Sequence, residues 1–381
     1  MRINQGGKQP RVITAAQAAA LVKSGDWLDY ATTLVQPDLF DTALAARKDE
    51  LQQVKIRSCI SVRPRAVLEA DPEGAHFFWF SWHFGGYDRA KHDAKISHYL
   101  PCNLGEIPDY YRRHSDPVDI AIIKARPADA NGLYDFGGSA LWHRAVVERA
   151  RVVIVELSDK LPVTHGIEHG IRHDEIDYII EGNDLAPAEL PSAPVSEVEH
   201  AVGRLIAAEI EDGSCLQIGI GGMPNAVCAS LKEAGVRNLG IHTEMLMDGL
   251  IDLYNAGQVT GANKATDKGK SAYTFVLGHK HLYDTVNNNR DFLSCPVDHT
   301  NLPHLIMQNP KVVAINNTTQ IDLQGQAASE SDGHRHISGT GGQAQFVRGA
   351  YASEGGKAFI CLASTYERRG IRKSRIVLNL T

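Results

Sequence analysis

The sequence predicts an α/β protein made of two open, mainly parallel α/β domains of similar architecture. Short apolar runs alternate along the chain with amphipathic segments that have helical spacing. Several of these runs are almost continuously apolar, which is typical of strands covered by helices on both faces. The 381 residues are enough for two or three domains of ~150 residues each.

The apolar runs give the expected strands in chain order. They include residues 27–31, 119–124, 151–156, 215–220, 239–242, 272–277, 311–315, 358–362 and 375–380. We expect a hairpin over residues 311–322, with Gly325 in its turn region.

A proline-rich stretch divides the chain. Residues 184–194 hold three prolines, which interrupt regular structure. A helix start follows at once, because Ser196 and Glu199 have the spacing of a capping box. We therefore expect an N-terminal α/β domain over residues 1–190 and a C-terminal α/β domain over residues 191–381.

The order of helix, glycine, strand and proline occurs in both halves. In the first half, Thr14 and Gln17 have capping spacing, and Gly25 separates their helix from the next strand. Gly213 has the same place in the second half. Because this order is common in α/β proteins, internal duplication and chance are both open explanations.

Charge and composition exclude several classes of protein. There are 39 Lys and Arg against 45 Asp and Glu, a net charge of −6, which argues against non-specific binding to nucleic acid or anionic membrane. The sequence shows neither a run of ~18 apolar residues nor an apolar signal segment at its start. The six cysteines are scattered without a C-x-x-C pair, as in a cytoplasmic protein with reduced thiols. We expect a cytoplasmic protein.

The first candidate site is a glycine cluster in residues 217–225. An apolar strand runs into Gly219, Gly221 and Gly222, and Pro224 stands where a helix would begin. Backbone N–H groups at such a helix start can bind an anion or an oxyanion. A dinucleotide-binding G-x-G-x-x-G motif would need glycine at 224. An ordinary tight turn explains the cluster equally well.

The second candidate is Glu244, which follows the expected strand at 239–242. Consecutive parallel strands usually lie side by side, so Glu244 and the glycine cluster would meet at one sheet edge, where α/β proteins bind ligands. A carboxylate there can act as a nucleophile or a general base. The spacing alone favours a simpler role, an acidic residue at a helix N-terminus.

The third candidate is a second glycine loop in residues 337–349. Gly341 and Gly342 precede Arg348, which would suit a phosphorylated or otherwise anionic ligand. A turn with a solvated arginine is the alternative.

Together these segments resemble the family I coenzyme A transferases, in the branch of acetyl-CoA hydrolases and transferases that includes the 4-hydroxybutyrate and butyryl-CoA:acetate CoA-transferases. The matching motifs are Q-x-G-I-G-x-x-P at 217–224, L-G-I-H-[ST]-E-M-x-x-D at 239–248, D-L-Q-G-Q at 322–326 and S-G-x-G-G-Q-x-x-F-x-R-G at 338–349. Residues 196–379 fit almost throughout. The first half fits mainly at residues 129–132 and 162–166.

The resemblance implies a ping-pong transfer of CoA with Glu244 as the nucleophile and Asn316 beside it. It also places coenzyme A contacts on Gly219, Ile220, Gly221, Gly222, Met223, Thr319, Gly341, Gly342 and Tyr366. The substrates would be an acyl-CoA and a short-chain carboxylic acid such as acetate, butyrate or 4-hydroxybutyrate, in a homodimer or higher homo-oligomer. An acyl-CoA hydrolase using the same glutamate and a non-catalytic CoA- or nucleotide-binding protein are the alternatives.

Two regions depart from the family pattern. Residues 158–166 read S-D-K-L-P-V-T-H-G where relatives often have N-x-N-M-P-x-T-x-G, and residues 76–84 are unusually aromatic. We therefore expect the acyl or acceptor pocket to differ from that of the named relatives. Relatives also continue for several tens of residues beyond position 381, so we expect the second domain to be truncated at its end.

Three histidines have a spacing that could indicate a metal site, but the residues between them argue against it. His165, His169 and His173 are four residues apart, which would bring three imidazoles to one face of a helix. Gly166 and Gly170 disfavour a helix here, and a zinc-binding H-E-x-x-H pattern is not formed. We expect no metal site.

Overall fold

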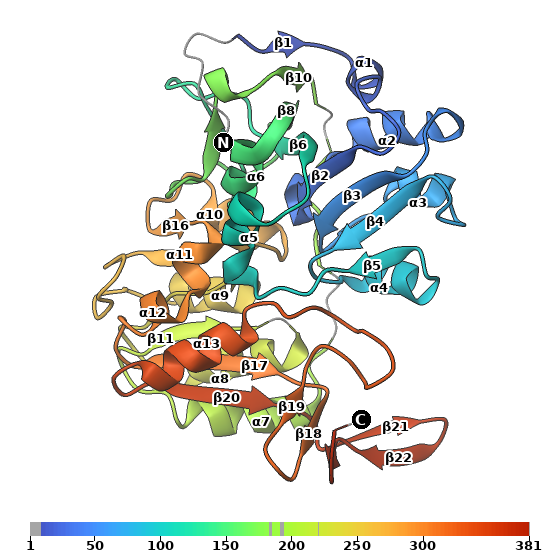
Figure 1. The fold of residues 1–381 in the computed structure, drawn as a ribbon. Coiled ribbons are helices and arrows are strands. Elements are labelled where there is room, and N and C mark those ends of the chain that lie inside the picture. Colours follow the sequence, from blue (N-terminus) through green and yellow to red (C-terminus); the bar gives the residue numbers. More distant parts are fainter. Residues whose placement is uncertain (1–8, 183–184, 191–193, 220, 381) are drawn as a thin grey trace. The chain divides into compact units, whose positions relative to one another are not determined.

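The computed structural model describes residues 9–182, 185–190, 194–219 and 221–380. It is a mixed α/β structure with mainly parallel sheets, as the sequence predicts (Figure 1). The chain divides into two compact units. The N-terminal unit extends to Ala188 and includes residues 286–289 and 294–298, and the C-terminal unit holds the rest. The boundary between the two units therefore crosses the sequence at several points. The expected domain limits near residue 190 stay a prediction.

The N-terminal unit is built on an eight-stranded sheet in which all neighbouring strands are parallel. Its order is β1 (Arg11–Val12), β10 (Tyr178–Ile180), β8 (Ala150–Leu157), β6 (Val118–Ala125), β2 (Trp27–Thr32), β3 (Val54–Cys59), β4 (Phe77–Ser81) and β5 (Ser97–Tyr99). The helices are α1 (Ala15–Ala19), α2 (Leu39–Ala45), α3 (Ala66–Ala70), α4 (Gly86–Asp93), α5 (Ile107–Arg113) and α6 (His143–Arg149). Strands β7 (Leu133–Asp135) and β9 (Gly170–Arg172) form a separate antiparallel pair.

Aromatic side chains fill the core of this unit. The rings of Tyr30 and Trp79 meet edge to face with centroids 5.8 Å apart, and Phe40 contacts the ring of Tyr30 at 5.9 Å. Phe77 and Trp79 alternate inward along β4 and are fully buried. The aromatic stretch at 76–84 therefore supplies packing for the sheet, where each ring removes a large apolar area from water.

Strand β3 was not expected from the sequence because a charge interrupts its apolar pattern. Arg57 lies inside β3, and its guanidinium donates to the carboxylate of Asp29 on neighbouring β2 at 2.9 Å. Both side chains are buried, and the hydroxyl of Tyr111 also donates to Asp29. Pairing is what makes two buried charges tolerable in a sheet.

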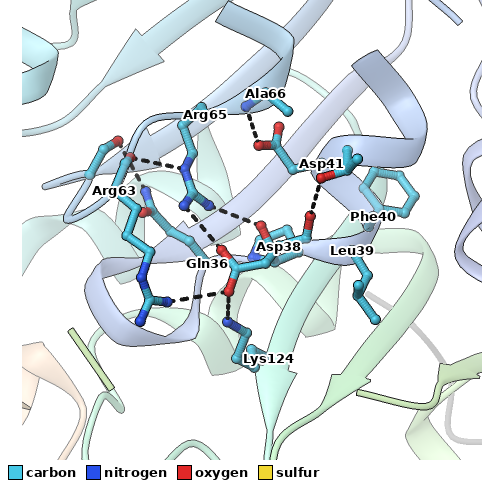
Figure 2. A network of polar contacts seen from close by, with 12 residues as sticks. Gln36, Asp38, Leu39, Phe40, Asp41, Arg63, Arg65, Ala66 and Lys124 are labelled. Carbon is cyan, nitrogen blue, oxygen red and sulfur yellow. Dashed lines mark hydrogen bonds and ion pairs between the residues drawn. The ribbon is translucent and has the colours of Figure 1, made fainter. Parts of the chain in front are cut away.

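A cluster of charges lies beyond the carboxyl ends of β2, β3 and β6 (Figure 2). Arg63 and Arg65 contact the carboxylate of Asp38 at 3.3 and 3.1 Å, and Lys124 contacts it from β6. Although burial raises the pKa of Asp38, the positive charges of Lys124, Arg65 and Arg63 bring it below its ordinary value. The cluster joins the segments that follow β2 and β3 to the end of β6 through one carboxylate.

The C-terminal unit contains a four-stranded parallel sheet. Its order is β12 (Gly240–Ile241), β11 (Cys215–Ile218), β17 (Val312–Asn317) and β20 (Lys357–Cys361). The helices are α7 (Glu197–Ala207), α8 (Gly222–Ala234), α9 (Asp248–Asn255), α10 (Lys280–Val286), α11 (Val297–Asn301), α12 (Pro303–Ile306) and α13 (Gln343–Ala352). On one face of the sheet Val312 and Ala314 pack against Phe346 of α13, while α8 lies on the other side and α7 packs against it (Figure 1).

The expected capping boxes are present in both units. The Thr14 hydroxyl accepts from the N–H of Gln17 at the start of α1, and Ser196 accepts in the same way from Glu199 at the start of α7. Gly25 and Gly213 both have φ near +80°, a conformation that glycine adopts without strain. The local turn chemistry was therefore predicted correctly from the sequence.

Three expected elements are wrong in detail. The run at 311–322 is not a hairpin, because β17 lies between β11 and β20 as a central strand. The hairpin is the next pair along, β18 (Gln320–Asp322) with β19 (Ala327–Ala328), and Gly325 is indeed in its turn. The run at 272–277 is split into β14 (Ser271–Tyr273) and β15 (Phe275–Val276), which pair with β16 (Phe292–Ser294) and β13 (Met245–Leu246) respectively. The last run is reduced to β23 (Ile376–Val377), preceded by the hairpin of β21 (Thr365–Arg368) and β22 (Ile371–Ser374).

The six cysteines are all free thiols. Five are buried and Cys102 is half-buried. Burial raises the pKa of Cys102, Cys215 and Cys361 to about 11 and that of Cys228 to about 12. In the described residues, none of the helices is long and apolar enough to cross a membrane.

The three spaced histidines do not share a helix. His169 precedes β9 and His173 follows it, with the ring of His173 bonded to Tyr134 at 3.0 Å. Within the described part of the chain, three or more His, Cys, Asp or Glu side chains do not converge in a group that could hold a metal ion.

Candidate active site

The candidate site lies at the carboxyl edge of the C-terminal sheet. Strands β11 and β12 are parallel neighbours, with Cys215 opposite Gly240 and Leu216 opposite Ile241. The glycine loop leaves β11 at this edge, and Glu244 follows β12 at the same edge. Strand β17, on the other side of β11, brings Asn316, its second-last residue, to this edge. Three candidate segments that are far apart in the sequence thus reach the edge at which parallel sheets bind ligands.

The carboxyl group of Glu244 is held on two sides. Nδ2 of Asn301 donates to Oε2 of Glu244 at 2.5 Å. The backbone of Gly342 lies so close that a Cβ there would be 2.2 Å from the same oxygen. The main chain of Glu244 is also fixed, because its carbonyl accepts from the N–H groups of Thr274 and Phe275. The carboxyl is therefore placed in one position.

The surroundings of Glu244 change its acidity. The residue is half-buried, so solvent reaches part of the side chain, while the carboxyl itself is packed deeply enough to lose much of its hydration. This desolvation raises the pKa of Glu244 from 4.5 to about 7, against the lowering effect of the Asn301 hydrogen bond. A carboxylate that has been stripped of water but is still partly ionised at neutral pH is a suitable nucleophile.

This pKa predicts how the reaction depends on pH. We expect kcat/KM for acyl-CoA to fall about tenfold per pH unit below pH 7 and to level off above pH 8, because only ionised Glu244 can attack. The titratable side chains on the neighbouring segments are those of His242, Lys264, Asp267 and His299. Burial lowers the pKa of His242 to about 3.

The measurement is a pH profile of initial rates, repeated with the dephospho form of the acyl-CoA because phosphate monoesters titrate near pH 6. A profile that is flat between pH 5.5 and 8 with both substrates would contradict the assignment of Glu244 as the nucleophile.

Asn316 is at the same sheet edge but is paired with Gln217. Its Oδ1 accepts from Gln217 at 3.2 Å and its Nδ2 donates back to Gln217 at 3.1 Å. Both side chains are buried. In the described structure the amide that contacts Glu244 belongs to Asn301, so the expected role of Asn316 beside the glutamate stays a prediction.

The glycine loop after β11 leads into helix α8, where the sequence predicts a helix start. Gly221 has φ of +126°, where a side chain would be strained. Gly222 starts α8, and a Cβ there would be 2.2 Å from Oε1 of Glu199, the capping residue of α7. Ile220 lies outside the described residues. Met223 is buried in the first turn of α8, whose leading N–H groups have no acceptor within the helix.

The remaining expected CoA contacts form a second group. The backbone carbonyl of Thr319 accepts from the guanidinium of Arg375 at 3.1 Å, and the same guanidinium lies over the ring of Tyr366 at 5.0 Å. The hydroxyl of Thr319 donates to the carbonyl of Ala328 within the β18–β19 hairpin. Gly341 has φ of +55° and precedes Gly342 at the start of α13. Gly342 is the member of this group that lies against the carboxyl of Glu244.

Sequence reasoning missed Asn301. It ends the short helix α11 and is fully buried. The segment around it, residues 297–301, has no glycine cluster, recognisable motif or periodic pattern that would mark it. Its position beside Glu244 depends on tertiary packing, which local sequence does not reveal.

Several known proteins are similar to this chain in both sequence and fold. The acetyl-CoA hydrolase/transferase N-terminal domain matches residues 2–191, and the acetyl-CoA hydrolase/transferase C-terminal domain matches residues 278–381. The chain is 42% identical over 375 residues to butyryl-CoA:acetate CoA-transferase of Anaerostipes caccae, covering 98% of this chain and 84% of that protein. It is 37% identical over 357 residues to 4-hydroxybutyrate coenzyme A transferase of Clostridium kluyveri, covering 93% of this chain and 82% of that protein.

A solved structure agrees with these sequence matches. The crystal structure of RipA from Yersinia pestis has a TM-score of 0.87 and 30% identity, covering 97% of this chain and 85% of that one. The matching family domains and the transferase relatives define an enzyme that works on coenzyme A esters. The chain belongs to the acetyl-CoA hydrolase/transferase family. The resemblance carried by residues 217–224, 239–248 and 338–349 is therefore confirmed.

Proposed function

We propose that this enzyme is a CoA transferase that moves CoA between an acyl-CoA and a short-chain carboxylic acid such as acetate, butyrate or 4-hydroxybutyrate, through a thioester on Glu244. The observation that carries the proposal is the carboxyl of Glu244, fixed against Asn301 and Gly342 at the sheet edge and desolvated there. The transferase names of relatives that are 37% and 42% identical support the same reaction class.

The reaction proceeds in balanced steps. A carboxylate oxygen of Glu244 attacks the thioester carbonyl, the C–S bond breaks, and CoA leaves as a thiolate from an acyl-glutamyl anhydride. The thiolate then attacks the glutamyl carbonyl, which breaks the anhydride and releases the first acid as its carboxylate. The enzyme now carries glutamyl-CoA. A second carboxylate repeats the two steps in reverse and leaves as the new acyl-CoA.

A carboxylate suits this exchange for an energetic reason. Anhydride and thioester are both activated acyl groups, so the free energy of the thioester is kept within each step. Each attack produces a tetrahedral oxyanion, which needs hydrogen-bond donors fixed in advance. The N-terminal N–H groups of α8, after Gly221, are candidate donors, and Gly219, Ile220, Gly222 and Met223 are proposed to lie along the bound CoA. Gly341, Gly342, Thr319 and Tyr366 are proposed as the other CoA contacts, and Asn316 as a further group of the catalytic site.

Acyl-CoA hydrolysis is the second candidate, because the same glutamyl-CoA can be attacked by water. The two reactions differ in whether the pocket excludes water from that thioester. Rates of acyl-CoA loss with and without added acetate separate them. A transferase needs the acid, whereas a hydrolase proceeds at the same rate without it.

The covalent intermediate gives the direct test. After incubation with acyl-CoA and no acceptor acid, we expect the mass of the protein to rise by that of CoA less one water, with the adduct on Glu244. Hydroxylamine should then inactivate the enzyme only if acyl-CoA was present, because it attacks an activated acyl group and not a carboxylate.

Acetate added before hydroxylamine should protect, since it carries the thioester on to product. The control is Glu50→Gln, at an exposed carboxylate of the N-terminal unit, which should give the same adduct as the wild type. If acyl-CoA produces neither adduct nor sensitivity, Glu244 is a base or a structural acid and the proposal is wrong.

We also propose a cytoplasmic location and a homodimer or higher homo-oligomer. Six free thiols support a reducing compartment. The oligomer is proposed from the family resemblance alone, and light scattering of the purified protein tests it.

A further inference from the structure

Three buried polar residues form a chain of hydrogen bonds behind the carboxyl of Glu244. Nδ2 of Asn301 donates to Glu244, and Oδ1 of the same amide accepts from the hydroxyl of Thr300 at 2.8 Å. The carbonyl of Thr300 accepts from Nε2 of His242 at 2.9 Å. Thr300 and Asn301 are fully buried and His242 is 2% exposed. This series of hydrogen bonds thus runs from the buried ring of His242 to the carboxylate of Glu244.

The chemistry of each group sets the direction of the whole chain. Burial lowers the pKa of His242 to about 3, so its ring is neutral, and because a carbonyl can only accept, its one proton is on Nε2. The imidazole thereby holds the backbone of Thr300. The carboxylate of Glu244 can also only accept, so the NH₂ group of Asn301 must face it. The Thr300 hydroxyl, donating to the other end of the amide, stabilises that orientation.

Resting on the proposed function, we infer that Asn301 is a further catalytic residue, and that Thr300 is a positioning residue which acts through it. Asn301 donates a hydrogen bond to Oε2 of Glu244, so that Oε1 is the oxygen that attacks the thioester. Once Oε1 is part of the anhydride, Oε2 is the glutamyl carbonyl oxygen. When the CoA thiolate attacks that carbonyl, the electron pair moves onto Oε2, where Asn301 already donates. One amide therefore aligns the nucleophile and then stabilises the oxyanion.

The packing around this contact supports a catalytic use. A Cβ on Gly342 would be 2.3 Å from Nδ2 of Asn301, so glycine at 342 leaves room for the amide as well as for the carboxylate. The bond joins an amide donor to a carboxylate acceptor, the kind of charge-assisted pair that is stronger than one between neutral groups. The amide of Asn316 is engaged with Gln217 in both directions, whereas that of Asn301 points its NH₂ group at the reacting carboxyl.

The test compares two substitutions at Thr300. Thr300→Val removes the hydroxyl and keeps the shape, so Asn301 loses the bond that orients it, and we expect kcat to fall about tenfold with KM for acyl-CoA nearly unchanged. Thr300→Ser keeps the hydroxyl and should retain a kcat within about twofold of the wild type. Asn301→Ala should lower kcat about a hundredfold.

The double variant Thr300→Val with Asn301→Ala should be no slower than Asn301→Ala alone, because Thr300 acts only through the amide. Thr285→Val, which removes a hydroxyl bonded within α10, is the matched control and should keep full activity. All rates are given per active site, counted by the covalent CoA adduct, and thermal unfolding is recorded for every variant so that misfolding is separated from catalysis.

Equal kcat for the valine and serine variants, or additive effects in the double variant, would overturn the inference. Failure of the inference can be told from failure of the proposed function. If Glu244→Gln is inactive while Asn301→Ala is normal, only the role of Asn301 is wrong. If Glu244→Gln is active, the nucleophile itself is misassigned.

Discussion

Glu244→Gln is expected to abolish CoA transfer while leaving the fold intact. The amide cannot form the anhydride, so the loss should exceed 10⁴-fold, or about 5 kcal/mol in the activation barrier. Glu244→Asp should lose most activity as well, because the shorter side chain withdraws the carboxylate by about 1.5 Å from the position set by Asn301 and Gly342. The measurement is steady-state transfer from acyl-CoA to acetate. A decrease of less than about tenfold in Glu244→Gln would mean that another residue is the nucleophile.

The same substitution should raise stability above neutral pH. Folding raises the pKa of Glu244 to about 7 from 4.5, so in the wild type the folded state carries the cost of a desolvated charge above pH 7. Glutamine removes that cost, and we expect the free energy of unfolding at pH 8 to rise by ~1 kcal/mol, discounted because the side chain is partly exposed. Below pH 4.5 the carboxyl is protonated in both states, so the difference should vanish there. Chemical denaturation at pH 4 and pH 8 measures it.

Gly342→Ala is the second change with a large expected effect. The new Cβ would be 2.2 Å from Oε2 of Glu244 and 2.3 Å from Nδ2 of Asn301, far inside contact distance. Both contacts are with side-chain ends, so the carboxyl can turn away and the fold survives. We expect kcat to fall by 10² to 10³-fold, because near-attack geometry is lost when the nucleophile moves by about 1 Å.

The control for this change is Gly86→Ala. Gly86 is exposed and has an ordinary φ, and a Cβ there would meet open space. That variant should keep its activity and its melting temperature. Wild-type kcat in Gly342→Ala would show that the loop before α13 is only a turn and that the carboxyl has room to spare.

The sequence allowed prediction wherever the signal is local. Capping boxes at Thr14 and Ser196, glycines between a helix and a strand, and buried apolar strands such as β6 were predicted, because each depends on neighbouring residues. The meeting of Glu244 with the glycine loop at one sheet edge also followed, from the rule that successive parallel strands lie side by side.

What could not be predicted depends on distant contacts. Strand β3 was hidden because Arg57 inside it is neutralised by Asp29 on another strand. The expected hairpin at 311–322 failed because β17 finds partners on both sides, β11 and β20, which are about a hundred and forty residues apart. Asn301 was missed for the same reason, since nothing near it in the sequence indicates that it contacts Glu244.

We expect the six free cysteines of the folded enzyme to react very little with disulfide-exchange dyes. Five are enclosed by protein, and thiols whose pKa is near 11 or 12 hold almost no thiolate at neutral pH. A chromogenic aromatic disulfide added to the reaction should therefore colour only with CoA set free in solution, apart from slow labelling of half-buried Cys102. Hydrolysis would then be visible in real time, whereas transfer would stay colourless because its thiolate is recaptured on the protein. In denaturant the same dye would count all six sulfurs, so one reagent reports both the loss of the fold and the escape of CoA.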